Sequence, residues 1–298
     1  MNADAQTRGA ASQSSGAHGP TEGPRDGSFD RSGEGVLRRG YLWARTVARW
    51  TASGLFFFTA CPALVVLGMV IDPRSNDGPQ RWLSRNLVRL AGARVKVKFS
   101  PGFDKSRTSF FVSNHVNLFD PFVLYGAVPQ FVRGLELESH FRIPAYGWMM
   151  KRFGNVPVPE GTRPSDLKRM WRLARAAVNS GVSLIVFPEG KRTITGRVGE
   201  FHDGGFRMAQ QFGVPVVPVS MVGSFEFNRK TSWLLRPATI VVYFHDTIET
   251  AKLDKSEVPR LRERVREIIA APIHAAIDAR APEAERSAME TWPPASSR

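Results

Sequence analysis

Cysteine is almost absent from this chain, which carries a single one, Cys61, among 298 residues. A disulfide within the chain is therefore excluded, and so is a metal site built from several cysteine thiolates. Cys61 lies in an apolar run and is expected to be a small buried side chain. The pairs His202-Asp203 and His245-Asp246 are isolated in the sequence, so we interpret them as surface polar groups and not as zinc ligands.

Two signatures of common enzyme classes are also missing. The sequence contains no Gly-x-Ser-x-Gly, the nucleophile turn of many serine hydrolases. The dipeptide Gly190-Lys191 lacks the upstream glycine of the phosphate-binding loop in kinases and ATPases. Neither enzyme class is indicated, and the sequence shows no internal repeat and no nucleic-acid recognition motif.

Acidic residues are scarce relative to basic ones. The chain has 41 Lys and Arg against 27 Asp and Glu, which gives a formal net charge of +14. Such a surplus favours a polyanionic partner: nucleic acid, an anionic membrane surface, or a phosphorylated or acidic substrate. Net charge alone does not choose among these three, so the apolar segments must be considered with it.

Both ends of the chain are poor in large apolar residues. Residues 1–35 are rich in Gly, Ser, Ala, Asp and Arg, and we expect them to be disordered because they can bury little apolar surface. Residues 282–298 are polar and contain proline, which predicts a flexible C-terminal tail. The first apolar stretch begins too late in the chain for a secretory signal peptide.

Residues 51–71 contain no charged side chain and are predominantly apolar. At about 1.5 Å per helical residue they cover roughly 30 Å, the thickness of a bilayer core. Arginine and aromatic residues typical of a headgroup layer precede them, namely Arg38, Arg39, Tyr41, Trp43, Arg45, Arg49 and Trp50. Residues 79–90 then show the pattern of a basic amphipathic helix. We expect segment 36–93 to be a helical membrane anchor, and favour a hairpin in one leaflet over a full span or a buried core helix.

From residue 94 the sequence alternates between short β-type runs and helical patterns. We expect strands at 94–99, 109–113, 130–135, 155–158, 182–187, 215–221 and 239–244, and helices at 166–180, 204–212 and 256–280. This alternation predicts an α/β domain over 94–281 with a largely buried sheet.

A polar cluster follows the apolar run that ends near Ser113. His115 emerges where the predicted strand ends, and α/β sheets place ligands at that edge. Asp120 comes five residues later and directly before Pro121, a pattern that begins helices. A tight turn would bring the Asp120 carboxylate to one imidazole nitrogen and leave the other free to accept a proton from a hydroxyl. The alternative is that Asp120 only caps a helix and His115 only packs.

A second polar cluster follows the run that ends at Phe187. It contains Glu189, Gly190, Lys191, Arg192 and Thr193. Glycine allows backbone conformations closed to other residues, and an arginine can hold phosphate oxygens in bidentate geometry. The cluster predicts a phosphate-binding turn, with a solvated basic turn as the alternative. A third motif, 214–219, has two prolines in a β run, which suits either a strand edge that lines an apolar channel or a plain core strand.

Together these clusters resemble the glycerolipid acyltransferase family, which includes the 1-acyl-sn-glycerol-3-phosphate O-acyltransferases. Asn114-His115 with Asp120 is similar to the family's histidine/aspartate motif, and Phe187 through Thr193 is similar to its substrate-phosphate motif. The resemblance covers about 37–272. It implies a mixed central sheet flanked by helices, His115 and Asp120 as catalytic residues, and Asn114, Glu189, Gly190, Lys191, Arg192 and Thr193 at the substrate. It also implies no metal or organic cofactor and a thioester acyl donor, either acyl-CoA or acyl-carrier protein.

One motif departs from the family pattern. Glu160 stands where an arginine is expected, and Glu136 and Glu138 lie where a lysine is expected. Arg163 follows three residues after Glu160 and is a candidate to replace the missing cation at the substrate, with Lys151 and Arg152 as the alternative. A carboxylate near a phosphate weakens binding, so acceptors with an amine or zwitterionic headgroup stay open beside 1-acylglycerol-3-phosphate.

The resemblance and the apolar segment together give the expected function. We expect an O-acyltransferase of phospholipid biosynthesis that acylates a lyso-lipid at the cytoplasmic face of the inner membrane. Its partners are then anionic membrane lipids, the acyl donor and the lyso-lipid acceptor, with no nucleic acid. A transacylase and a non-catalytic lipid-binding relative are the alternatives.

Overall fold

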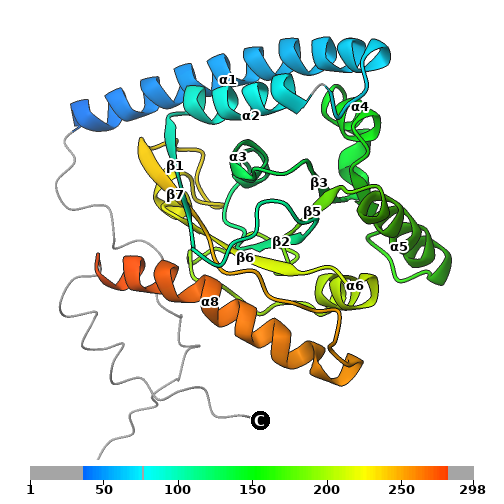
Figure 1. Cartoon of the computed structure of the whole chain (residues 1–298). Coiled ribbons are helices and arrows are strands. Elements are labelled where there is room, and N and C mark those ends of the chain that lie inside the picture. The colour runs from blue at the N-terminus through cyan, green and yellow to red at the C-terminus, as the bar shows by residue number, and fades with distance from the viewer. Residues whose placement is uncertain (1–35, 76, 281–298) are drawn as a thin grey trace, which may run out of the picture. The chain divides into compact units, whose positions relative to one another are not determined.

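The computed structural model describes residues 36–75 and 77–280 (Figure 1). The predicted tails at 1–35 and 282–298 lie outside the described residues. Seven strands form one sheet in the order β1-β7-β6-β2-β5-β3-β4. Their bounds are β1 Ala93–Phe99, β2 Phe110–Ser113, β3 Val132–Leu137, β4 Val156–Val158, β5 Ser183–Val186, β6 Val216–Val222 and β7 Ala238–Phe244. Each lies within two residues of a strand expected from the sequence.

The sheet is mixed. All neighbouring strands run parallel except β6 and β7, which are antiparallel. Every residue of β2 and β5 is buried. These two strands lie inside the sheet with layers on both faces, which explains their continuous apolar sequences. Strand β6 is also internal, so the proline-bearing third motif is a core strand and not a sheet edge.

Helices cover the two faces of the sheet (Figure 1). The helices are α1 Val36–Val70, α2 Asp77–Ala91, α3 Asp120–Ala127, α4 Tyr146–Arg152, α5 Pro164–Asn179, α6 Gly204–Phe212, α7 Ser224–Phe227 and α8 Val258–Asp278, with 3-10 turns η1 Glu138–Arg142 and η2 Lys255–Glu257. Phe111 and Ile185 pack in one cluster with α2 and α3, whereas Phe110 and Leu184 pack in another with α5, α6 and α8. Neighbouring residues of a strand point to opposite faces, so each strand contributes to both cores.

Helix α1 contacts the α/β domain along most of its length. Near its start, Trp50 donates from Nε1 to the carbonyl of Trp233 at 2.8 Å. In the middle, Phe57 packs edge-on against Phe122 of α3. Near its end, the side chain of Arg152 donates to the carbonyl of Gly68. Helix α2 packs Leu87 and Val88 into the same hydrophobic core as α3. One core therefore continues across residue 93, where α2 is followed by β1.

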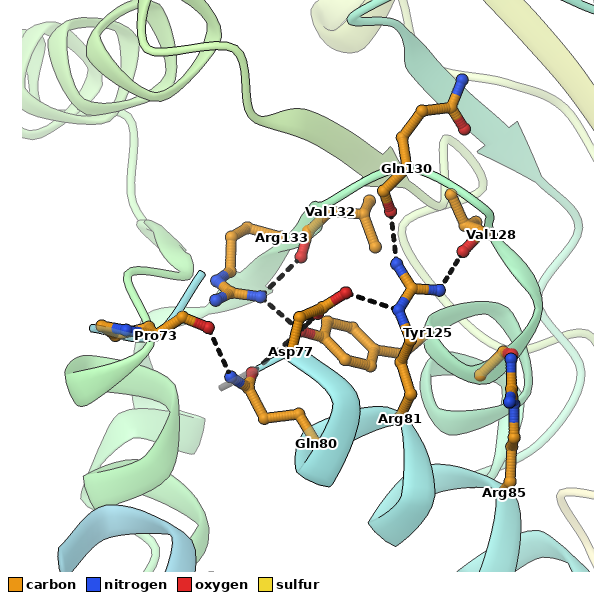
Figure 2. A network of polar contacts seen from close by, with 11 residues as sticks. Pro73, Asp77, Gln80, Arg81, Arg85, Tyr125, Val128, Gln130, Val132 and Arg133 are labelled. Carbon is orange, nitrogen blue, oxygen red and sulfur yellow. Dashed lines mark hydrogen bonds and ion pairs between the residues drawn. The ribbon is translucent and has the colours of Figure 1, made fainter. Parts of the chain in front are cut away.

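A polar network fixes α2 to the domain (Figure 2). Arg81 on α2 donates to Asp77 and to the carbonyls of Val128 and Gln130. The hydroxyl of Tyr125 on α3 lies 2.9 Å from Asp77 Oδ1 and accepts a hydrogen bond from Arg133 of β3. Arg133 is fully buried, and this burial lowers the pKa of its guanidinium. The Tyr125 hydroxyl therefore joins α2, α3 and β3.

We expect Tyr125→Phe to destabilise the protein by about 1–3 kcal/mol, because it removes the hydrogen bonds that the Tyr125 hydroxyl forms with Asp77 and with the buried guanidinium of Arg133. Urea-induced unfolding measures this change in the free energy of unfolding. Tyr243→Phe is the matched control, since its hydroxyl forms no hydrogen bond within the described part of the chain. Equal stability of the two variants would contradict the role given to Tyr125.

Candidate active site

The site lies where β2 and β5 end. These strands are adjacent and parallel, so their carboxyl ends reach the same edge of the sheet. The loop after β2 carries His115, and the loop after β5 carries 189–193. Two backbone-mediated hydrogen bonds join the loops at His115. Its N–H donates to Glu189 Oε1 at 2.9 Å, and its carbonyl accepts from the N–H of Thr193 at 2.9 Å. The two clusters expected from the sequence thus form one site.

His115 and Asp120 form the expected pair. His115 Nδ1 lies 2.9 Å from Asp120 Oδ2, and the Asp120 side chain is fully buried. The same oxygen accepts the backbone N–H groups of Val116 at 2.5 Å and Asn117 at 2.8 Å. Asp120 is also the first residue of α3 and is followed by Pro121, so the residue that begins the helix also pairs with His115.

This hydrogen bonding fixes the imidazole tautomer. Asp120 Oδ2 already accepts two N–H groups, so it acts as an acceptor toward His115 Nδ1 as well. The proton of a neutral imidazole then resides on Nδ1, and Nε2 carries the free lone pair. The ring of His115 stacks on Phe187 with centroids 4.3 Å apart, and the side chain stays 19% exposed. Nε2 is therefore a base held in a fixed orientation and reachable by a substrate.

Glu189 is a positioning residue in this geometry. Its carboxylate accepts the N–H of His115 at 2.9 Å and the N–H of Gly199 at 3.2 Å, and its side chain is buried. Burial raises the pKa of Glu189, while the two backbone hydrogen bonds act in the opposite direction. The carboxylate thereby ties the base-bearing loop to both ends of the loop after β5. The structure thus supports a bridging role for Glu189.

The second cluster contributes two cationic side chains, Lys191 and Arg192. Gly190 has a φ of 65°, a left-handed conformation that favours glycine, and the chain turns there toward Arg192. Lys191 is exposed and Arg192 is half-buried. Neither forms an ion pair with a carboxylate among residues 39–75 and 77–280. Thr193 bonds to the His115 backbone, so Arg192, the residue before it in the chain, belongs to a segment that is tied to the His115 loop.

Two expected substrate residues lie elsewhere. The Asn114 amide is buried, with its Oδ1 accepting the N–H of Met221 at 2.9 Å and its Nδ2 near the Met221 carbonyl at 3.3 Å. It joins β2 to β6, and this geometry does not support a direct substrate contact. Arg163 is exposed at the start of α5, after β4. Strand β4 is three strands from β2 at the same sheet edge, which is roughly 14 Å.

The sequence did not predict the positions of Asn117 and His245 in the structure. Asn117 accepts the N–H of Phe119 and donates to the carbonyl of Ser224 at 2.9 Å, which shapes the turn between His115 and Asp120. An asparagine inside a short polar turn was the available signal. His245 was expected on the surface, but it is half-buried and lies 2.8 Å from the Ser220 hydroxyl. It forms no contact with the His115 cluster.

The segment that carries the site is similar in sequence to known proteins. Residues 94–222 match the family model Acyltransferase, and this stretch contains His115, Asp120 and 189–193. A 1-acyl-sn-glycerol-3-phosphate acyltransferase from Cocos nucifera is 26% identical over 61% of this chain and 58% of its own length. The chloroplastic 1-acyl-sn-glycerol-3-phosphate acyltransferase BAT2 from Brassica napus is 34% identical over 48% of this chain and 42% of its own length. The matched segment 94–222 is therefore similar to the acyltransferase domain of glycerolipid acyltransferases.

The family's fold is shared as well. The crystal structure of the 1-acyl-sn-glycerophosphate (LPA) acyltransferase PlsC from Thermotoga maritima superposes with a TM-score of 0.67 at 22% identity. The superposition covers 83% of this chain and 100% of the PlsC chain. The glycerolipid acyltransferase fold expected from the sequence is confirmed. The chain spans about half the length of the curated relatives it matches, 58% and 42% for the two named above.

Proposed function

We propose that this protein transfers a fatty acyl group from a thioester to the hydroxyl of 1-acylglycerol-3-phosphate, with His115 as general base. The observation that carries the proposal is the His115–Asp120 pair at 2.9 Å, which orients the imidazole so that Nε2 is free to accept a proton. A histidine oriented in this way suits proton removal from an alcohol. The names of the curated relatives support the same reaction class.

The reaction follows from the placement of these groups. Nε2 of His115 takes the hydroxyl proton while the acceptor oxygen attacks the thioester carbonyl carbon. The tetrahedral adduct collapses, the C–S bond breaks with its electron pair on sulfur, and the thiolate takes the proton from Nε2. An ester and a free thiol result. Asp120 holds Nδ1–H through both steps and stabilises the imidazolium that forms between them.

Substrate positions follow from the chemistry around the base. Arg192 suits a phosphate because it is unpaired and presents a planar fork of donors. An apolar cavity between α2, α3 and α4 extends from Phe187, the residue that stacks on His115, toward Met149 and Phe153. Its volume is about 60 Å³, so its apolar lining supports the proposal that a short part of the acyl chain of donor or acceptor enters there. Glu160 is exposed at the same sheet edge as His115, and this favours testing amine-bearing acceptors beside the phosphate.

Acyl transfer by the detergent-solubilised full chain tests the proposal. Labelled acyl-CoA and acyl-carrier protein are offered with lyso-lipids that carry a phosphate monoester, a zwitterionic headgroup or an amine. Product on 1-acylglycerol-3-phosphate is expected. Product on the other acceptors alone would reassign specificity to Glu160, and transfer only from a diacyl lipid would indicate a transacylase. Absence of any transfer by folded protein would favour a non-catalytic lipid-binding relative.

We further propose that α1 and α2 anchor the protein in one membrane leaflet, with the site facing the cytoplasmic side. Helix α1 carries a segment long and apolar enough to cross a membrane. Leu55, Phe58, Val66 and Met69 recur at helical spacing on α1, each at least 59% exposed. The same helix contacts the α/β domain from Trp50 to Gly68, which supports an anchor lying beside the domain over an isolated span.

Charges on this exposed face should release the protein from membranes. We expect Phe58→Glu with Val66→Glu to lower partition into liposomes at least about tenfold, because two carboxylates replace apolar contact with lipid. Liposome flotation measures the bound fraction. Leu167→Glu with Leu173→Glu on α5 is the control, since these leucines are exposed on a helix outside the anchor. Equal flotation of both double variants would refute the anchor.

A further inference from the structure

A second hollow lies between α2, α3 and the edge strand β1. This β1 groove has a volume of about 560 Å³ and an open mouth. Its apolar lining includes Val95, Val97 and Phe99, each more than a third exposed although they follow one another on one face of β1. Gly126 of α3 also lines it, and a side chain there would meet the stem of Arg85. The apolar face of β1 is therefore left uncovered by the two helices beside it.

Two arginines of α2, Arg85 and Arg89, lie at the rim of this apolar surface, and both are exposed. Arg94 also borders the groove, but it directly precedes Val95 on β1, so its side chain points to the opposite face of the strand. Arg85 donates to the carbonyl of Gly126 at 2.9 Å, and Arg89 to Asn86 at 3.2 Å. Figure 2 shows Arg85 on α2, outside the network formed by Arg81. A fourth cation, Lys105, lies 4.2 Å from the ring centroid of Phe99.

No acid neutralises these arginines. The groove has no aspartate or glutamate in its lining, and none forms an ion pair with them among residues 39–75 and 77–280. Elsewhere in this part of the chain, Arg107, Arg169, Arg197, Arg207, Arg262, Arg266 and Arg280 each pair with a carboxylate. An apolar trough with an unneutralised cationic rim matches an amphiphile that has an anionic headgroup.

We propose that the β1 groove binds one anionic phospholipid of the membrane, with its phosphate on Arg85 and Arg89 and one acyl chain along the apolar face of β1. Arg85 and Arg89 lie on the amphipathic helix α2, where Trp82 and Leu90 expose apolar surface. Such a helix lies at headgroup depth, which is where a lipid phosphate is found. The groove is separate from the reaction centre, because its lining contains neither His115 nor any residue of 187–193. It is thus a lipid site that acyl transfer does not require.

Native mass spectrometry of the full chain, released from a non-ionic detergent, tests this site. Phosphatidylglycerol and phosphatidylcholine with identical chains are titrated, and the dissociation constant of the first bound lipid is obtained for each. We expect the wild type to bind phosphatidylglycerol at least about tenfold more tightly. Arg85→Gln with Arg89→Gln removes this preference, since each well-placed cation contributes about fivefold.

Two further variants separate a built groove from general charge. Val97→Trp fills the groove without changing its charge and should also abolish the preference for phosphatidylglycerol. If Val97→Trp does not fold, Val95→Trp is used in its place. Arg260→Gln with Arg264→Gln removes the same charge from exposed positions on α8 and should retain the preference, as should His115→Ala. Overturning results are equal binding of both lipids by the wild type, an unchanged preference in the filled groove, or equal loss in the α8 double variant.

Discussion

Replacing His115 with alanine is expected to lower turnover by about 10²–10⁴, the usual contribution of a positioned general base. The reason is local: Asp120 Oδ2 holds Nδ1 at 2.9 Å, and no second histidine contacts this pair among the described residues. Steady-state acyl transfer measures the loss. Because the His115 backbone and not its ring bonds to Glu189 and Thr193, the loops should keep their arrangement in the variant.

A double mutant sharpens this prediction. Asp120→Asn removes the acceptor that fixes the tautomer and should also reduce turnover strongly. Once the imidazole is absent, Asp120 has no proton to hold, so His115→Ala with Asp120→Asn should be no slower than His115→Ala alone. Thermal unfolding controls for the start of α3, where Asp120 also accepts two backbone N–H groups. Multiplicative losses in the double variant, or near-normal activity of His115→Ala, would reject the pair as the catalytic base.

Replacing Arg192 is expected to raise the KM for a phosphate-bearing acceptor about 10- to 100-fold, because a charge-assisted hydrogen bond to a buried or half-buried group contributes about 1.5–3 kcal/mol. Turnover at saturation should change much less. Arg192→Lys should give an intermediate KM, since lysine keeps the charge but loses the planar fork of donors. The comparison requires two acceptors that differ only in the phosphate monoester.

The control for Arg192 is Arg264→Ala, an exposed arginine on α8 at the other face of the sheet. It removes the same charge far from His115 and should leave KM unchanged. An equal KM increase for acceptors with and without phosphate would show that Arg192 acts on the donor or on the loop. Unchanged KM for both acceptors would remove Arg192 from the substrate site.

Much of the fold could be predicted because buried strands have plain apolar sequences. Phe110-Phe111-Val112 and Leu184-Ile185-Val186 are continuous apolar runs, and both became central strands. The pairing of His115 with Asp120 was also predictable, because the two residues share one short turn and need no long-range packing. In both cases the determining interactions lie within a few residues along the sequence.

Features that depend on distant residues could not be predicted. Tyr125, Asp77 and Arg133 meet only after α2, α3 and β3 have packed, and none belongs to a local pattern. Helix α4 follows Ala145 with a φ of 62°, which local propensity does not predict for alanine. The β1 groove likewise exists only because α2 and α3 leave one face of an edge strand uncovered.

The most direct test of the central claim counts products of the wild-type protein in one reaction. Labelled acyl thioester is mixed with the full chain, with and without 1-acylglycerol-3-phosphate, and ester, free thiol and protein mass are measured together. The account predicts one thiol for each ester with acceptor present, and without acceptor neither rapid thiol release nor an acylated protein. A covalent acyl-protein intermediate, or folded protein that forms no ester with any acceptor, would contradict direct transfer by His115.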